Sequence, residues 1–375
     1  MAEKQLKVAV LGTRGFPHVQ GGVEKHCEEL YPRLVDLGCD VTVFTRTPYI
    51  PEGQRQAAWK GVKFVHLWCP RKKSLEAILH TFYGILKARI LSPDVLHIHS
   101  IGPSLLAPMA RIMGMKVMMT HHGPDYQREK WGAAARLALR LGERMGVLYS
   151  NRVIAISKGI QQHAAKLFGK TASYIPNGVT VPQTTEPGAI VKQWVLEPGR
   201  YAFTACRFVP EKGLHDLIKS YGSIENPQFK LVIAGDADHE TDYSRNLKKA
   251  AAETKGVVLT GFISGQPLAE LFSNAAFFVL PSYYEGLPIA LLEALSYGLP
   301  VAVSDIPQHR EIPLADKRYF PVGDAAGMAE VMRAVFSTGI SADEKESYDK
   351  LLRETYNWDR IAEQTIRVYE EVVRQ

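Results

Sequence analysis

The chain has 375 residues and a formal net charge of +6, with 46% hydrophobic and 22% charged residues. This composition is typical of a soluble globular protein and excludes a disordered or fibrous chain, and the length fits two domains better than one. The small basic excess decides nothing by itself, and no nucleic-acid partner is expected.

The first half alternates short β-branched runs with longer amphipathic stretches. Strands are predicted at residues 6–12, 40–46, 62–67, 94–100, 116–122 and 152–157. Helices are predicted between them at residues 22–38, 74–89, 103–114 and 126–146. This alternation is the pattern of βαβ units around a mostly parallel sheet.

Residues 173–194 break the rhythm with Pro, Gly, Asn and Thr, and we interpret them as a linker. Further strands are predicted at residues 201–208, 230–236, 256–262, 275–281 and 300–304, and helices at 213–223, 243–254, 266–274 and 287–298. The predicted fold is therefore α/β with two Rossmann-like doubly wound domains, residues 1–180 and 181–356, facing across a cleft. The amphipathic helix at 357–375 is expected to pack back on the first domain.

Neither export nor membrane insertion is predicted. The N-terminal residues run straight into a strand without the apolar region and cleavage site of a signal peptide. The apolar runs are far shorter than the roughly 20 residues that cross a bilayer. The four scattered cysteines form no CxxC pair, which indicates a reducing compartment without a disulfide framework or a zinc site. A cytoplasmic protein is expected.

Two carboxylates eight residues apart, Glu285 and Glu293, mark the first candidate site. Glu285 precedes a helix expected to begin near Leu287, with Pro288 in its first turn. The helix is apolar nearly all round, so Glu293 needs a partner, and a ribose offers two hydroxyl donors. The N–H groups at the helix start suit a phosphate. The alternative is a Glu293 paired with Lys or Arg and a solvated Glu285.

A basic pair, Arg207 and Lys212, marks the second candidate site. Both residues lie between a predicted strand and a predicted helix, at the carboxyl end of the first strand of the second domain. Ligands of doubly wound sheets bind at that edge, so the pair is expected to hold a diphosphate by charge-assisted contacts. The alternative is an exposed basic pair without a ligand.

Over almost its whole length the chain resembles the GT-B glycosyltransferases of family 4, which are retaining enzymes. In the second half the resemblance is carried by RFVPEKGLHDLI, LVIAGD, VVLTGFIS and PSYYEGLPIALLEALSYGLPVAVSD. In the first half it is carried by TRGFPHVQGGVEKHCEELYPRL, DVLHIHS, THHGPDYQREKWG and IAISKGI. The E-x7-E pair within this order of motifs is the specific signal.

The resemblance implies a role for each site residue. Glu285 contacts the transferred sugar, Glu293 the ribose, and Arg207 and Lys212 the diphosphate, with His122 beside the sugar and His121 as the neighbouring alternative. The remaining donor contacts are the helix start and the base-binding and glycine loops: Leu287, Pro288, Ile289, Phe262, Ile263, Gly21 and Gly22. The two glycines are expected to allow close approach of the chain to the ligands.

Several patterns compete with this interpretation and are set aside. Asp236 and Asp238 form a D-x-D, which we interpret as a capping and turn cluster rather than a metal site. His97 and His99 share one face of a strand but lack a third ligand at a suitable spacing, so we interpret them as core or cleft histidines. No GxGxxG is present, which argues against a nicotinamide-dependent oxidoreductase. No metal and no cofactor are predicted.

The function predicted is metal-independent, retaining transfer of a hexose or N-acetylhexosamine from a nucleoside-diphosphate sugar to a glycan or lipid-linked acceptor. UDP is favoured slightly over GDP. Basic residues 71–73 and residues 127–146 predict a peripheral membrane contact, at the inner face of the membrane, with a helix packed on its own domain as the alternative. Two other functions remain open: a GT-B nucleotide-sugar epimerase, and a non-catalytic nucleotide-sugar-binding module.

Overall fold

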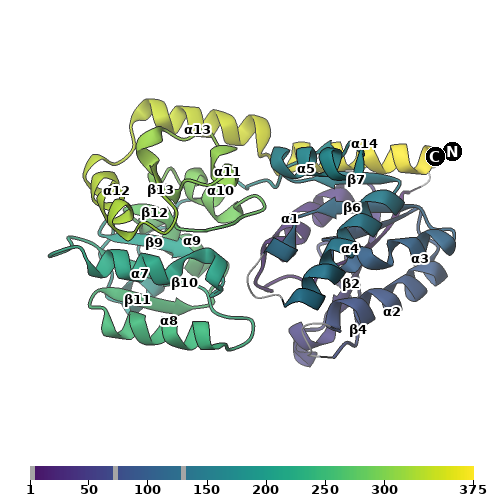
Figure 1. The fold of residues 1–375 in the computed structure, drawn as a ribbon, viewed down its shortest axis with the longest axis horizontal. Coiled ribbons are helices and arrows are strands. Elements are labelled where there is room, and N and C mark those ends of the chain that lie inside the picture. Colours follow the sequence, from purple (N-terminus) through teal and green to yellow (C-terminus); the bar gives the residue numbers. More distant parts are fainter. Residues whose placement is uncertain (1–4, 71–74, 128–131) are drawn as a thin grey trace. The chain divides into compact units, whose positions relative to one another are not determined.

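The computed structural model describes residues 5–70, 75–127 and 132–375. Contacts divide the chain into two compact units, which are described separately. Unit 1 runs to Asn177 and resumes at Trp358, and unit 2 comprises Gly178–Asn357. The sequence division after residues 180 and 356 lies within three residues of these boundaries. Figure 1 shows a parallel-sheet α/β architecture in each unit, which confirms the predicted fold class.

Unit 1 is built on an eight-stranded sheet in the order β3-β4-β2-β1-β5-β6-β7-β8. Only β3 pairs antiparallel with its neighbour among the described strands. The strands are β1 (Lys7–Leu11), β2 (Asp40–Arg46), β3 (Ala58–Trp59), β4 (Val62–Leu67), β5 (Val95–His99), β6 (Val117–His121), β7 (Arg152–Ala155) and β8 (Ser173–Tyr174). The helices are α1 (Gly22–Asp36), α2 (Glu76–Leu91), α3 (Ala107–Ile112), α4 (Ala133–Tyr149), α5 (Lys158–Phe168) and α14 (Trp358–Arg374).

Alternating side chains of β1 enter two different cores, because successive residues of a strand point to opposite faces. Val8 and Val10 pack with α1 and α14, whereas Ala9 and Leu11 pack with α2 and α3. The C-terminal helix α14 therefore belongs to the core of unit 1. Its fully buried Tyr369 and Ala362 lie in the same cluster as the strand residues.

Unit 2 has a six-stranded parallel sheet in the order β11-β10-β9-β12-β13-β14. Its strands are β9 (Tyr201–Ala205), β10 (Lys230–Ala234), β11 (Val257–Gly261), β12 (Phe277–Leu280), β13 (Val301–Ser304) and β14 (Tyr319–Phe320). Its helices are α6 (Ala189–Gln193), α7 (Leu214–Gly222), α8 (Asp242–Glu253), α9 (Gln266–Asn274), α10 (Ile289–Ser296), α11 (Pro307–Arg310), α12 (Ala325–Thr338) and α13 (Ala342–Thr355). The strand order reverses between β9 and β12, so their carboxyl ends form the switch point where ligands of such sheets bind.

Single turns of 3-10 helix connect several of these elements. They are η1 (Thr47–Tyr49), η2 (Glu52–Gln54), η3 (Pro103–Leu106), η4 (Asp125–Gln127), η5 (Pro210–Lys212) and η6 (Asp316–Arg318). The helix predicted at 103–114 is divided between η3 and α3, and the first residues of the stretch predicted at 126–146 form part of η4. Residues 71–74 and 128–131, which contain part of the predicted membrane contact, lie outside the described residues.

Three groups of helices were not predicted: α5, α6 and α11 to α13. Helix α6 lies within the residues interpreted as a linker. Helix α5 is framed by Ser157, whose hydroxyl accepts from the Ile160 N–H, and by Gly169 in the left-handed conformation, both of which are recognisable end signals. Helices α11 to α13 lie where no element was assigned. In α13 only Tyr348 and Leu352 are buried, so apolar residues do not recur along the helix often enough to indicate it from the sequence. No helix within the described ranges is both long and apolar enough to span a bilayer.

Candidate active site

Three of the predicted site residues meet at the carboxyl edge of the unit 2 sheet. Arg207 follows β9, Lys212 ends η5, and Glu285 lies in the loop between β12 and α10. Gly213 makes this arrangement possible because its φ is +63° and an added Cβ would collide with the Pro281 carbonyl oxygen. The loop after β9 therefore packs directly against the end of β12, where a side chain would keep the two apart.

Glu285 is buried and ion-paired, which makes the alternative of a solvated loop residue wrong. Its side chain is 9% exposed, and its Oε1 lies 2.5 Å from Lys212 Nζ. The Ser282 hydroxyl donates to the same oxygen at 2.6 Å. Burial raises the pKa of Glu285, but the Lys212 charge and these hydrogen bonds lower it by a larger amount. The pKa of Glu285 therefore lies below 4.5. A carboxylate and an ammonium thus face each other at the switch point.

His309 is a buried neighbour of this pair that the sequence interpretation missed. It is fully buried in α11, and its Nδ1–H donates to the Ser304 carbonyl oxygen at 2.8 Å. Its Nε2 has no hydrogen-bond partner among the described residues. Burial lowers the pKa of His309 to about 4, with Glu285 acting in the opposite direction. The available signal was the turn I-P-Q-H after β13, which follows the same edge of the sheet.

Arg207 reaches the loop after β10. Its Nη1 donates to Asp238 Oδ2 at 3.0 Å, and its side chain is 20% exposed. Asp236 pairs with Lys248 at 2.8 Å. The D-x-D was interpreted as a capping and turn cluster, but Thr241 caps α8, so the capping part is wrong. Both carboxylates instead neutralise cations.

The helix after Glu285 begins later than predicted. Helix α10 starts at Ile289, because Pro288 has an extended ψ of 94° and forms the N-cap, while Leu287 is 5% exposed in the preceding loop. Glu293 is half-buried in the second turn. Glu293 has an interaction within the protein, so its position on an apolar helix does not by itself require a ribose.

The predicted base contacts lie in the loop that follows β11. Phe262 is 43% exposed, and Ile263 is half-buried. An exposed aromatic ring at the carboxyl edge of a doubly wound sheet offers a surface on which a planar base can stack.

In unit 1 the two predicted glycines differ. Gly21 caps α1 with φ +151°, and an added Cβ would overlap the Arg14 and Glu24 side chains, which pair with each other at 3.2 Å. At Gly22 an added Cβ would meet no atom within 4 Å. The fold itself therefore requires glycine at position 21 but leaves room for a side chain at position 22.

The structure separates the roles of His121 and His122. His121 is fully buried, and its Nε2 lies 2.8 Å from Glu143 Oε1 while its Nδ1 accepts from the Gly123 N–H at 3.1 Å. His122 is only half-buried, and its Nε2 lies 2.9 Å from His99 Nδ1. Because both ring nitrogens of His121 have internal partners, the geometry favours His122 as the residue that contacts a ligand.

His97 is a core histidine, as predicted. It is fully buried, its Nδ1 contacts the Tyr369 hydroxyl at 2.8 Å, and its Nε2 contacts the Thr120 hydroxyl at 2.7 Å. His99 belongs instead to a group with two other histidines, which does not include His97. His26 and His122, from α1 and the loop after β6, bring their ring nitrogens within 4.8 Å of one another and of His99. The spacing of residues along the chain could not reveal this convergence of three segments.

Comparisons with known proteins match both halves of the chain. The family described as Glycosyltransferase Family 4 matches residues 20–182, and the family described as Glycosyl transferases group 1 matches residues 189–358. An uncharacterised glycosyltransferase of Methanocaldococcus jannaschii is 25% identical over 97% of this chain and 98% of its own.

One further relative and one solved structure add to these matches. A GDP-mannose:cellobiosyl-diphosphopolyprenol alpha-mannosyltransferase of Xanthomonas campestris is 32% identical over 58% of this chain and 57% of its own. The sucrose-phosphate synthase structure from Thermosynechococcus elongatus has a TM-score of 0.82 at 20% identity, covering 98% of this chain and 99% of its own. The last comparison concerns the fold alone.

Proposed function

The chain belongs to the family 4 glycosyltransferases with the GT-B fold, and from this premise we propose that it is a retaining hexosyl- or N-acetylhexosaminyltransferase. The donor is a nucleoside-diphosphate sugar, and the acceptor is a glycan or lipid-linked glycan. The observation that carries the proposal is the Lys212–Glu285 pair at the switch point of unit 2, where Arg207 follows β9 at the same edge of the sheet. These groups match a diphosphate and a sugar hydroxyl in charge and hydrogen-bonding capacity.

In the proposed reaction Arg207 and Lys212 neutralise the charge that grows on the departing diphosphate. Such stabilisation is stronger in the transition state than in the ground state, so it accelerates the chemical step. Glu285 accepts a hydrogen bond from the transferred sugar, Glu293 accepts one from the ribose, and His122 contacts the sugar. The acceptor attacks from the face that the diphosphate leaves, which retains the anomeric configuration. A donor phosphate oxygen takes the acceptor proton, and the two cations supply the positive charge without a metal ion.

The nucleotide base is the part of the donor most easily tested. We propose UDP ahead of GDP, and GDP is the specific rival because the Xanthomonas relative is named for GDP-mannose. In a thermal-shift panel of UDP, GDP and ADP, one nucleotide should raise the melting temperature well above the others. A ligand at a hundred times its dissociation constant stabilises by about 2.7 kcal/mol. Glu293→Gln should reduce this shift, and equal or absent shifts for all three nucleotides would contradict a donor site.

A donor-only incubation separates transfer from epimerisation. Without acceptor, the proposed enzyme should leave the sugar configuration of the nucleotide-sugar unchanged by NMR, whereas an epimerase would convert it.

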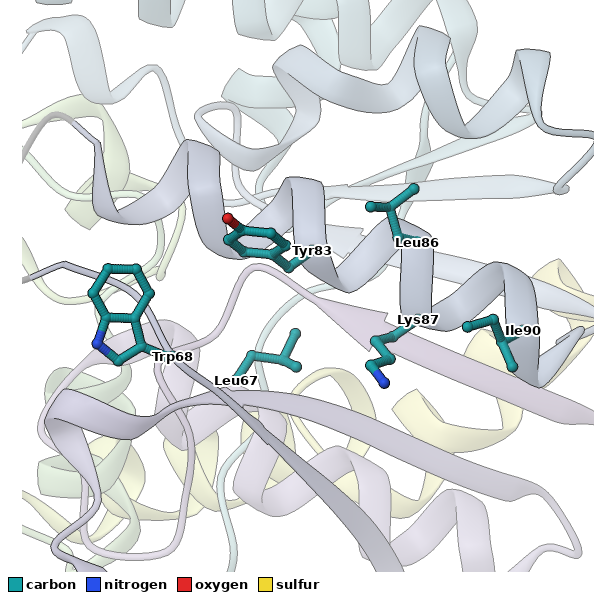
Figure 2. Close-up of a pocket in the computed structure, with 6 residues that line it drawn as sticks. All are labelled: Leu67, Trp68, Tyr83, Leu86, Lys87 and Ile90. Carbon is teal, nitrogen blue, oxygen red and sulfur yellow. The ribbon is translucent and has the colours of Figure 1, made fainter.

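The acceptor side of the proposal is supported by an apolar and cationic surface on unit 1. A pocket of about 360 Å³ is lined by Leu67, Trp68, Tyr83, Leu86, Lys87 and Ile90 (Figure 2). Trp68 is 65% exposed and Ile90 75%, and Leu137 on α4 is 69% exposed. Isolated exposed apolar residues need no explanation, but exposed apolar residues that line a pocket suit an interaction surface.

The charges of α2 and α4 specify the partner of this surface. Their basic residues are all exposed: Lys87, Arg89, Arg136, Arg140 and Arg144. Their two acidic residues are buried, with Glu76 paired to Arg46 at 2.6 Å and Glu143 held by His121. An outer surface with apolar side chains and only positive charge complements an anionic lipid bilayer. We therefore propose peripheral contact with the cytoplasmic face of a membrane that carries the acceptor.

Sedimentation with vesicles tests this contact. The protein should sediment with anionic phosphatidylglycerol vesicles and much less with neutral phosphatidylcholine vesicles. Ile90→Ser combined with Leu137→Ser should weaken binding about tenfold or more, because burial of each side chain is worth up to about 1.5–3 kcal/mol. Val181→Ser is the matched control, since Val181 is also 69% exposed but lies in unit 2. Equal sedimentation of all variants would contradict the assigned surface.

A further inference from the structure

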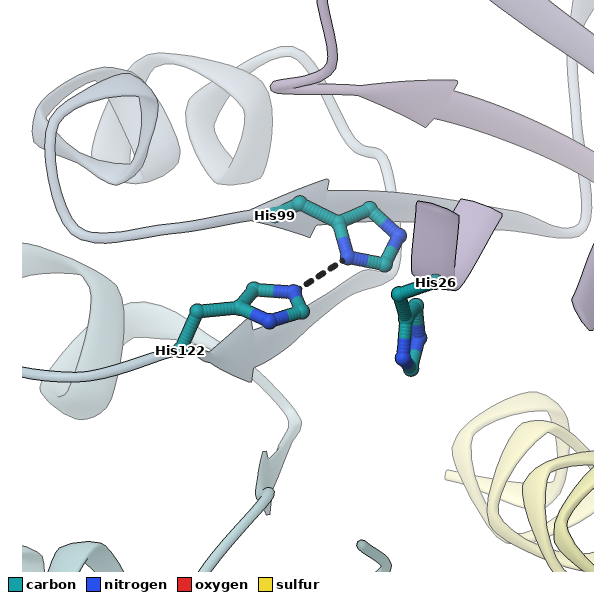
Figure 3. A group of neighbouring side chains, drawn as sticks. All are labelled: His26, His99 and His122. Carbon is teal, nitrogen blue, oxygen red and sulfur yellow. Dashed lines mark hydrogen bonds between the residues drawn. The ribbon is translucent and has the colours of Figure 1, made fainter. Parts of the chain in front are cut away.

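Three histidines from separate segments converge in unit 1, and no step of the proposed transfer uses them together. His26 lies in α1, His99 ends β5, and His122 follows β6. Their ring centroids form a triangle with sides of 5.4, 5.0 and 5.2 Å (Figure 3). One nitrogen of each ring lies within 4.8 Å of the other two.

His26 has one ring nitrogen without a hydrogen-bond partner among the described residues. Its Nδ1–H donates to Asn177 Oδ1 at 2.9 Å, which leaves the lone pair on Nε2. The side chain is 3% exposed, and Nε2 has no hydrogen-bond partner among the described residues. A buried polar atom left without a partner is unfavourable, so a ligand that accepts this lone pair is favoured.

The other two rings are oriented toward the same point. The outer nitrogen of His99, Nε2, contacts the Tyr31 hydroxyl, which leaves Nδ1 directed at His122. His99 Nδ1 and His122 Nε2 are 2.9 Å apart. Partners on the outer nitrogens, here Asn177 and Tyr31, are the usual means by which proteins fix the tautomer and orientation of metal-binding histidines.

We propose that His26 Nε2, His99 Nδ1 and His122 Nε2 bind a divalent transition-metal ion such as Zn²⁺. Zinc–nitrogen bonds of about 2.0–2.1 Å in tetrahedral geometry place ligand nitrogens roughly 3.3 Å apart. The 2.9 Å pair needs to open by a few tenths of an ångström. The His26 nitrogen, which lies within 4.8 Å of the other two, needs to close by up to about 1.5 Å. Three imidazoles without a carboxylate suit Zn²⁺, Cu²⁺ or Ni²⁺ and disfavour Mg²⁺ and Ca²⁺, which take oxygen ligands.

Occupancy of this site inhibits transfer, because the metal fixes the His122 ring that is assigned to the sugar. This consequence rests on the proposed function, whereas the metal site itself does not. Transfer should therefore proceed in EDTA and fall when Zn²⁺ is added at the concentration that fills the site.

Metal binding is measured on the whole chain without donor or acceptor. Calorimetric titration of EDTA-treated protein with Zn²⁺ should give one ion per chain, and Co²⁺ should give the visible absorption of a tetrahedral site. His122→Asn and His26→Gln should each weaken binding about tenfold or more. Tyr31→Phe, which removes only the hydroxyl beside His99, should weaken it by about 10–100-fold, as losses of such orienting partners do.

A matched control excludes binding to surface histidines. His215 has a side chain that is 45% exposed and lies in unit 2, and His215→Asn should leave the Zn²⁺ affinity unchanged. Melting curves identify any variant that fails to fold. His122→Asn is the variant least prone to misfold, because the His122 side chain is only half-buried. Absence of stoichiometric Zn²⁺ binding, or wild-type affinity in His122→Asn, His26→Gln and Tyr31→Phe, would overturn the site. Zn²⁺ binding without inhibition of transfer would leave the metal site standing and would overturn only the proposed inhibition.

Discussion

Lys212→Met should destabilise unit 2 by about 3–5 kcal/mol and abolish sugar transfer. The substitution leaves Glu285 as a buried carboxylate without its cation, which is the costly outcome when one partner of a buried ion pair is removed. Urea unfolding of the variant, followed beside the wild type, measures the loss. Transfer is lost independently, because the ammonium no longer faces the diphosphate.

A double variant separates the two effects. Lys212→Met with Glu285→Leu replaces the pair by apolar side chains, an exchange that is often neutral or stabilising, so the free energy of unfolding should return toward the wild-type value. Activity should stay absent. Recovery of transfer in this variant would show that the pair is structural and that the assigned roles are wrong.

The pH dependence of stability follows from the same pair. Burial in the folded state raises the pKa of Glu285, but the positive charge of Lys212 lowers it by more. The pKa in the folded state therefore lies below its ordinary value of 4.5. The stability that the carboxylate contributes is therefore fully present above pH 4.5 and lost as the pH falls through the lowered value. The stability difference between wild type and Lys212→Met should narrow below about pH 4.5.

Arg207→Ala should lower kcat/KM by about 100- to 1000-fold, which corresponds to roughly 2.7–4 kcal/mol of transition-state stabilisation. The melting temperature should change little, because the pair of Arg207 with Asp238 is partly exposed and such pairs contribute about 0–1 kcal/mol. Activity and stability therefore separate at this residue.

Arg245→Ala provides the control for Arg207. Arg245 also forms an ion pair in unit 2, with Asp242, but its side chain is 53% exposed and lies on α8. Both activity and melting temperature should remain at wild-type values. Full activity in Arg207→Ala, or an equal loss in both variants, would remove Arg207 from the proposed diphosphate contact.

The sequence predicted that Arg207, Lys212 and Glu285 lie at one edge of the unit 2 sheet, because local order determines that position. Arg207, Lys212 and Glu285 each follow a strand of a parallel sheet, and the carboxyl ends of such strands meet at one edge. The type of these three residues and their position after a strand were therefore enough to place them together at this edge. The internal partner of Glu293 could not be foreseen, because helical periodicity gives the face of a residue but not what packs against that face.

Side-chain convergence across elements was the part that the sequence could not supply. His309 approaches Glu285 only because α11 folds the chain back after β13, and His26 approaches His99 only because α1 packs on the sheet of unit 1. Neither contact leaves a period or a spacing in the sequence. The first residue of α10 was missed for a local reason, since Pro288 adopts an extended conformation and caps the helix.

Helix α14 imposes an order on the synthesis of the protein. Unit 1 lacks Trp358, Ile361 and Tyr369 until the last residues are made, although its strands are made first. Unit 2 is contiguous, and its two ends pair with each other where the Val179 N–H donates to the Tyr356 carbonyl oxygen at 2.7 Å. A nascent chain on the ribosome therefore completes its second unit before its first. A premature stop codon just before residue 358 would release a chain in which only the later-made unit is whole.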